Sequence, residues 1–477
     1  MDKETLSHYG WIVILVLILA VLLALASPFG NFIAEGFKAT YVGFFQTGEN
    51  ALGIIIPGSE TKEDEEQGDA YALILDNTSN ANEPYPMIFV RTEKEVKIGD
   101  SFNSKTYGEK VVLAVYTGFE TETYNAEYMD DWLAGSDVPW REKSRDVTCV
   151  VFESKISPVS TSMWFAWFEN CDDFNMQKLD TSNVINMSHM FYDSGITDAS
   201  SLNVSNNVTT IESIFENCSN LTVAPILKNA NNLINLKKAF YWSDIRIAPE
   251  LPQNVENLYF TFAYCKNLTK ASDIISNKTI SIDGIYTNCE SLVGEMTIIA
   301  DVPGVGVSNI YGSFYSVGSK GSFTIKSNDI SILGWIKAGS YGNVDAIITL
   351  DGGTDYVESN YTSYQGLNDQ NSGTSTILYI SEGIKTVQLA AFRFCQGLEE
   401  VYLPSTLKSI EGSAFLYFGG DFYYEGTIAE WNEIETGSLW CGPYSNLSYL
   451  NNANQSYVCA TVHCSDGDVL IYPKDLR

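Results

Sequence analysis

The chain has few histidines, and this shortage excludes several kinds of enzyme. Only three of its 477 residues are histidine, namely His8, His189 and His463, and none stands in the spacing of a zinc protease. We expect His189 to be a structural residue, and the adjacency of Cys464 in one strand argues against a nucleophile pair with His463. No serine-hydrolase elbow, phosphate-binding loop or dinucleotide fingerprint occurs. The sequence therefore predicts a protein that is not an enzyme and has no cofactor.

Positive charge is also scarce. The chain has 28 Lys and Arg residues against 59 Asp and Glu residues, which gives a net charge of −31. A surface this acidic repels phosphate backbones and offers no basic patch to an anionic membrane. The sequence therefore predicts no nucleic-acid partner. Asp351-Gly352-Gly353 and Asp466-Gly467-Asp468 lack the spread of oxygen ligands that calcium needs, so we interpret both as turns and expect no metal site.

The nine cysteines are an odd number, which argues against a complete disulfide framework. Five of them share one position of a repeat, where we expect a buried ladder of small apolar side chains: Cys171, Cys218, Cys265, Cys289 and Cys395. Three others are close enough in sequence for a local disulfide, and their status stays open: Cys441, Cys459 and Cys464.

A single long apolar run, Gly10–Ala26, lies near the N-terminus. As a helix its 17 residues would span roughly 26 Å, just short of the ~30 Å hydrocarbon core of a bilayer. Tyr9 and Trp11 stand where an interfacial aromatic belt is expected. We therefore predict a retained transmembrane anchor, with the chain at the cell membrane and its repeats outside the cell. Cleavage after Ala24-Leu25-Ala26 is the alternative, so the fate of residues 1–26 stays open.

This run and the residues before it, Glu4 to Gly10, resemble the N-terminal helix of Flp-type and related type IV-like pilins. The chain departs from the pilin pattern, because Lys3 precedes Glu4 and His8 precedes Tyr9. The resemblance implies self-assembly through the N-terminal helix.

An aromatic anchor returns about every 24 residues through the middle of the chain, usually with cysteine three residues later. The steps are 23, 24, 25, 22 and 24 residues, and two further units follow at Phe392 and Phe415. A fixed period of this size predicts a solenoid, whose units bury their apolar faces by stacking. Trp164, Trp167 and Trp242 lie close to anchors, and we expect them in the core. The six regular anchors are Phe168, Phe191, Phe215, Phe240, Phe262 and Tyr286.

Composition divides the chain on either side of the repeats into separate regions. Residues 1–59 form the hydrophobic helix region, 60–69 an acidic linker, and 70–145 a small β-rich module that we expect to cap the solenoid. The solenoid runs over 146–420 and diverges over 295–375, and 421–477 form a C-terminal capping segment. The predicted fold class is thus a mostly β solenoid with short helical or irregular turns, preceded by a β-rich module and a transmembrane helix.

The repeats resemble those of BspA-like leucine-rich repeat surface proteins. Residues 179–191 read Leu-Asp-Thr-Ser-Asn-Val-Ile-Asn-Met-Ser-His-Met-Phe, and 401–410 read Val-Tyr-Leu-Pro-Ser-Thr-Leu-Lys-Ser-Ile. The resemblance covers roughly residues 146 to 470 and implies a bacterial surface protein that adheres to proteins or glycans of a host or a neighbouring cell. It implies no catalytic residues. Two functions stay open, a membrane-anchored adhesin or ligand-binding module and a structural subunit of a pilus-like filament, and the sequence names no binding residues.

Overall fold

The computed structural model describes residues 67–76, 85–129, 132–301, 313–328, 344–350, 356–357, 376–393, 398–418, 420–443 and 458–476. The chain forms two compact units, Met1–Glu65 and Glu66–Arg477, and only the second contains described residues. The predicted transmembrane helix Gly10–Ala26 and the pilin-like start lie outside them. Within the described ranges, no helix is both long and apolar enough to cross a bilayer.

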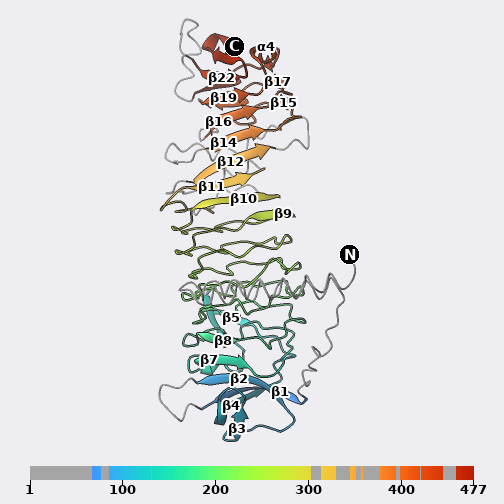
Figure 1. Ribbon diagram of the computed structural model, residues 1–477, viewed down its shortest axis with the longest axis vertical. Helices are drawn as coiled ribbons and strands as arrows, with labels where there is room; N and C mark the ends of the chain where they lie inside the picture. The colour runs from blue at the N-terminus through green and yellow to red at the C-terminus, as the bar shows by residue number, and fades with distance from the viewer. Residues whose placement is uncertain are drawn as a thin grey trace, which may run out of the picture. The chain divides into compact units, whose positions relative to one another are not determined.

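The N-terminal module is a sheet that continues into the first repeats. Its strands are β1 Asp69–Leu75, β2 Pro86–Thr92, β3 Ser101–Ser104 and β4 Gly108–Thr117. β1 pairs antiparallel with β2 and β4, whereas β2 pairs parallel with β7 (Cys149–Phe152), and β7 with β8 (Asp173–Asn175). The module thus covers the end of the repeat stack by sharing its sheet (Figure 1). A hairpin follows, formed by β5 (Ala126–Met129) and β6 (Trp132–Ser136), and then a short 3-10 helix, η1 (Arg141–Lys143).

Between β8 and β9 the chain forms coils joined by isolated parallel bridges instead of long strands (Figure 1). One row of bridges runs through every coil at a polar residue whose side chain accepts a hydrogen bond from the backbone two residues later. Asn186 Oδ1, for example, accepts from Ser188 N at 2.8 Å, and Asn235 Oδ1 accepts from Lys237 N at 3.1 Å. These local turns bend the chain, which is why Asn, Ser and Thr recur there. The row consists of Ser160, Asn186, Thr210, Asn235, Asn257 and Ser281.

Each coil then makes a tight turn with two residues of positive φ placed four apart. In these turns alternate N–H groups donate to the next coil, as His189 N does to Glu212 O at 2.8 Å and Phe191 N to Ile214 O at 2.9 Å. The other N–H groups donate to carbonyls within the same coil, so the backbone N–H groups have hydrogen-bond acceptors without a regular strand. We call this side of the stack the turn face. Its positive-φ pairs, with φ between 52° and 66°, are Met163 and Trp167, His189 and Asp193, Ser213 and Asn217, Lys238 and Trp242, Phe260 and Tyr264, and Gly284 and Asn288.

The predicted aromatic ladder forms between these pairs, midway along each turn. Neighbouring rings lie 5.3 to 5.5 Å apart, from Phe165 through Phe191 and three further phenylalanines to Tyr286. The prediction of Phe168 as the first anchor was wrong. The positive-φ pair Met163 and Trp167 places Phe165 in register with Phe191, 26 residues later, while Phe168 is buried beside it at 5.5 Å. Either phenylalanine of this coil could have filled the anchor position by its side chain alone, and the backbone turn places Phe165 there.

From residue 274 onwards the solenoid gains regular parallel strands. They continue in chain order through the segment whose sequence diverges, so the repeat architecture persists over 295–375 where strands are described. The strands of the main sheet are β9 Ile274–Thr279, β10 Gly294–Asp301, β11 Phe323–Ser327, β12 Val344–Leu350, β14 Thr376–Ile380, β16 Leu398–Leu403, β19 Asp421–Tyr424, β22 Ala460–Cys464 and β23 Gly467–Ile471.

Shorter strands form the other sides of these coils. β13 (Tyr356–Val357), β15 (Thr386–Val387), β17 (Ser409–Ile410) and β20 (Glu435–Thr436) make a second parallel sheet. β18 (Phe415–Tyr417) pairs with β21 (Cys441–Pro443) in a third. The antiparallel strand β23 ends the main sheet, with α4 (Ile428–Trp431) and η4 (Pro473–Leu476) beside this end of the chain.

The cysteine ladder is confirmed for Cys218, Cys265 and Cys289. The prediction was wrong for Cys171, because Phe168 holds the ladder position of the first coil, three residues after Phe165, and Cys171 Sγ donates instead to Asp173 O at 3.5 Å. Cys171, Cys218, Cys265 and Cys289 are all buried, and three of the thiols donate to a carbonyl of the preceding coil, as Cys218 Sγ does to Phe191 O at 2.9 Å. Cys395 lies outside the described residues. Burial raises the pKa of the Cys218 thiol to about 12, so these thiols stay protonated and act as donors within the core.

The other cysteine prediction concerned a local disulfide near the C-terminus. Cys441 and Cys464 are free thiols, so neither forms a disulfide with Cys459. Cys441 begins β21 in the third sheet and is buried, as suits a small apolar side chain.

Candidate functional site

A cluster of exposed aromatic side chains lies on the turn face. The prediction that the three tryptophans near the anchors are core residues holds for Trp164 and Trp167, but it was wrong for Trp242, which is 50% exposed. Trp242 follows its anchor Phe240 by two residues, and alternate residues of the turn point outward. Proximity to an anchor in the sequence therefore did not indicate burial.

Trp242 is the centre of a group of five rings that we call the aromatic patch: Tyr241, Trp242, Tyr259, Phe260 and Tyr264. Trp242 stacks on Tyr264 of the next coil at 5.2 Å, and Tyr264 meets Tyr241 edge-on at 5.4 Å. Tyr259 and Phe260 lie 4.6 Å apart, and Phe260 lies 6.2 Å from Tyr241. The rings thus fix one another across two coils and form a preformed surface.

A glycine makes room for one ring of the aromatic patch. Gly284 has φ +64°, and a Cβ built on it would lie 2.4 Å from the Phe260 ring. The Phe260 side chain therefore rests directly on the backbone of the next coil. A larger residue at 284 would displace it.

Two lysines border the aromatic patch, and both are paired with glutamates of the preceding coil. Lys237 Nζ lies 2.8 Å from Glu212 Oε1, and Lys238 Nζ lies 3.4 Å from Glu216 Oε1 and 5.3 Å from the centre of the Tyr241 ring. Burial raises the pKa of the Glu212 carboxyl, but the hydrogen bond and charge of Lys237 outweigh burial and hold that pKa below its usual value. The aromatic patch is thus locally neutral on a chain of strong negative charge.

The β5–β6 hairpin reaches the same face further towards the N-terminus. The Tyr128 hydroxyl lies 3.1 Å from His189 Nε2, and the two rings are 6.3 Å apart. His189 is buried, and burial lowers its pKa to about 4. His189 is therefore neutral near pH 7 and holds the hairpin on the coil, in keeping with the structural role expected of it.

A second row of aromatic side chains lies on the main sheet of the C-terminal coils. Tyr379, Tyr402, Tyr423 and His463 are register neighbours, and their rings stack 4.4 to 4.9 Å apart. Because each ring face is covered by the next ring, this row presents mainly edges to a partner. The aromatic patch, with Trp242 half exposed, is the better contact surface.

Catalytic and metal chemistry has no visible basis in the described part of the chain. His463 Nδ1 lies 2.8 Å from Asp468 Oδ1, so its partner is a carboxylate and not the adjacent Cys464. Within the described ranges, no group of three or more His, Cys, Asp or Glu residues could hold a metal ion.

Comparison with known proteins shows what the repeats are similar to. A search of curated proteins finds no match. Among solved structures, the chain is similar to a leucine-rich repeat protein from Bacteroides ovatus, at 12% identity over 73% of this chain and 91% of that chain, with a TM-score of 0.27. The family model of the BspA type Leucine rich repeat region matches residues 148–269, 187–311 and 370–420, with six copies. These segments of the solenoid are therefore similar to BspA-type leucine-rich repeats.

Proposed function

We propose that this chain is a membrane-anchored, non-catalytic cell-surface protein that adheres to a protein partner on a host or neighbouring cell through the aromatic patch. The observation that supports this most is the exposure of Trp242 in a preformed cluster of five rings. Tyrosine and tryptophan dominate the energetics of protein interfaces because they bury large areas at a small entropic cost. A leucine-rich repeat stack is a rigid scaffold for such a surface.

The backbone at the aromatic patch supports a binding role over a structural one. The residue equivalent to Trp242 has positive φ in the other coils of the turn face as well. Three of those coils have Asp193, Asn217 or Asn288 at this position. Asn and Asp tolerate this conformation, whereas a bulky side chain is strained in it by roughly 1–2 kcal/mol. Trp167, Trp242 and Tyr264 nevertheless stand there. Trp167 is covered by Arg141 and Tyr192, whereas Trp242 stays half exposed. Aromatic residues at a position that favours Asn are expected where they contact a partner.

The test is adhesion by native cells that carry the full chain with Trp242→Asn and Tyr264→Asn. We expect at least a tenfold loss of adhesion to a layer of cultured epithelial cells, because both stacked rings leave the interface while Asn suits the backbone. Surface staining with an antibody to the repeats checks that the variant is displayed, and circular dichroism checks that it folds.

The matched control is Ile226→Asn, which replaces a side chain that is 63% exposed and lies outside the aromatic patch. It should adhere as the wild type does. Equal adhesion of the double variant and the wild type would refute a role for the aromatic patch, and absence of surface staining in the wild type would refute surface display. The pilus-like filament depends on residues 1–66, which lie outside the described residues, and it stays a prediction.

A further inference from the structure

The charged side chains beside the aromatic patch offer a partner donors more readily than acceptors. The Lys237 side chain is 40% exposed and that of its partner Glu212 27%, while Lys238 is 35% exposed and Glu216 only 11%. An ammonium carries three N–H groups, and each lysine gives one of them to its glutamate. The lysines therefore have further N–H groups to offer at the surface, whereas the carboxylates are less accessible.

The carboxylate oxygens near the aromatic patch already accept hydrogen bonds within the chain. The second oxygen of Glu212, Oε2, accepts from Asn235 Nδ2 at 3.1 Å. Two residues after Trp242, Asp244 Oδ1 accepts from Asn267 Nδ2 at 2.5 Å. The aromatic patch thus offers a partner aromatic rings, phenol hydroxyls and ammonium groups, while the carboxylates beside it are occupied.

A partner that fits this surface must supply apolar area and hydrogen-bond acceptors, and it must bring few donors. An ordinary extended peptide brings an N–H group at every residue, and each one that is buried without an acceptor costs about 1–3 kcal/mol. A saccharide has the same difficulty, since every hydroxyl carries a donor. An acidic peptide would supply acceptors, but the net charge of −31 repels it.

Proline-rich segments meet these requirements. Proline has no backbone N–H, and the carbonyls of a polyproline II helix make no internal hydrogen bonds and can accept from a partner. The helix docks on aromatic surfaces and is formed before binding, so little entropy is lost. We propose that the aromatic patch binds a proline-rich segment of the partner in the polyproline II conformation. This inference rests on the proposed function and names the chemistry of the partner.

The test measures, by fluorescence anisotropy, the binding of the full chain to a labelled peptide of repeated Pro-Pro-Leu units. The wild type should bind it at least tenfold more tightly than the same peptide with alanine in place of proline, because alanine restores the N–H groups and frees φ. Trp242→Asn and Tyr264→Asn should each weaken binding at least tenfold. An excess of unlabelled proline-rich peptide should also reduce the adhesion of native cells.

The matched control is Ile226→Asn, which removes an exposed apolar side chain outside the aromatic patch and should bind as the wild type does. Unchanged unfolding midpoints check that the variants fold. The inference is overturned if the alanine peptide, a glutamate-rich peptide or a neutral oligosaccharide binds as tightly, or if the patch variants match the wild type. Adhesion that depends on Trp242 and Tyr264 without binding of the proline-rich peptide would overturn this inference and leave the proposed function standing.

Discussion

At the scale of single residues, the turn face shows how one backbone position can serve two purposes. Asn217 and Trp242 occupy equivalent places with φ of 65° and 58°. Asn217 suits that conformation and donates to the Tyr192 hydroxyl at 3.3 Å, whereas Trp242 is strained and exposes half of its surface. The repeat backbone therefore sets the conformation, and the choice of side chain decides whether the coil contributes to a contact surface.

His189 gives the protein a pH-dependent stability between about pH 6.5 and 4. Its pKa is lowered by burial from 6.5 to about 4; among nearby charges, Lys237 and Lys238 lower it further and Glu212 opposes them. In this window the unfolded chain binds the proton that the folded chain excludes. The free energy of unfolding should therefore fall as the pH drops, by up to about 1.4 kcal/mol per pH unit from this group.

Urea unfolding of the wild type and of His189→Asn at pH 7 and pH 5 measures this effect. Asn suits the positive φ of residue 189 and does not titrate, so the variant should lose less stability between the two pH values. Groups that titrate elsewhere in the chain contribute alike to both proteins. An equal loss in the two proteins would contradict the assignment.

At the scale of an element, the cysteine ladder depends on a hydrogen bond as well as on size. The equivalent positions of neighbouring coils hold Ser194 and Ser243, both buried. Their hydroxyls lie 3.6 and 3.5 Å from Cys218 Sγ and Cys265 Sγ. Thiol and hydroxyl therefore share the ladder, in the order Ser194, Cys218, Ser243, Cys265 and Cys289, because both groups can donate a hydrogen bond.

Two substitutions at Cys218 separate the hydrogen bond from packing. Cys218→Ser keeps a donor for Phe191 O and should change the free energy of unfolding by less than about 1 kcal/mol. Cys218→Val fills the space but removes the thiol donor and leaves Phe191 O with Ser194 N alone, at 3.1 Å, so it should cost about 0.5–1.5 kcal/mol more than the serine variant. Denaturant unfolding of the two variants is the measurement. A valine variant as stable as the serine variant would show that packing alone matters.

At the scale of the whole molecule, stacked coils need protection at their ends. β22 continues the parallel sheet by pairing with β19, and β23 ends it by folding back antiparallel on β22. The N-terminal sheet protects the other end in the same way, through the pairing of β2 with β7. An uncovered strand edge in a repeat stack favours association between copies.

Deletion of residues 458–477 should therefore expose the edge of β19 and produce soluble oligomers or aggregates. Light scattering after size-exclusion chromatography measures this outcome, with the full chain as reference. The control is Leu470→Lys, which changes a side chain of β23 that is 44% exposed and leaves the pairing of β22 intact. A truncated chain that stays monomeric would show that β22 and β23 are dispensable as a cap.

The sequence alone determined the solenoid, its period and its buried ladders, because each coil repeats the same apolar spacing and can bury it only against a neighbour. Strands at 72–75, 86–90, 110–116 and 398–403 were likewise predictable, since they are short apolar or alternating runs, and each lies within an observed strand. The register of the first coil could not be predicted, because Phe165 and Phe168 are equally apolar and only the backbone turn distinguishes them.

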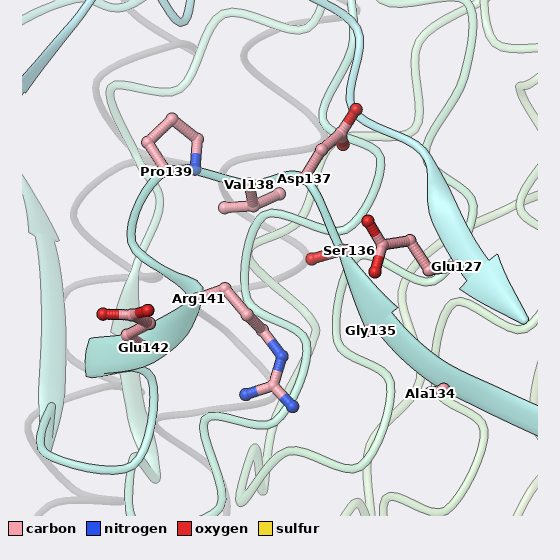
Figure 2. A pocket seen from close by; sticks show the side chains of 9 residues that line it. All are labelled: Glu127, Ala134, Gly135, Ser136, Asp137, Val138, Pro139, Arg141 and Glu142. Atoms are coloured by element: carbon pink, nitrogen blue, oxygen red, sulfur yellow. The ribbon is translucent and has the colours of Figure 1, made fainter.

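The binding surfaces were decided by the tertiary structure. Trp164, Trp167 and Trp242 look alike in the sequence, yet only Trp242 is exposed. Trp167 shares the turn position of Trp242, but Arg141 lies over its ring and Tyr192 packs against it, so exposure depends on what folding places over a residue. The pocket between β6 and η1 (Figure 2) likewise joins elements whose side chains meet only through folding. Periodicity shows which residues a coil must bury, but only the stacking of coils shows which side chains remain for a partner.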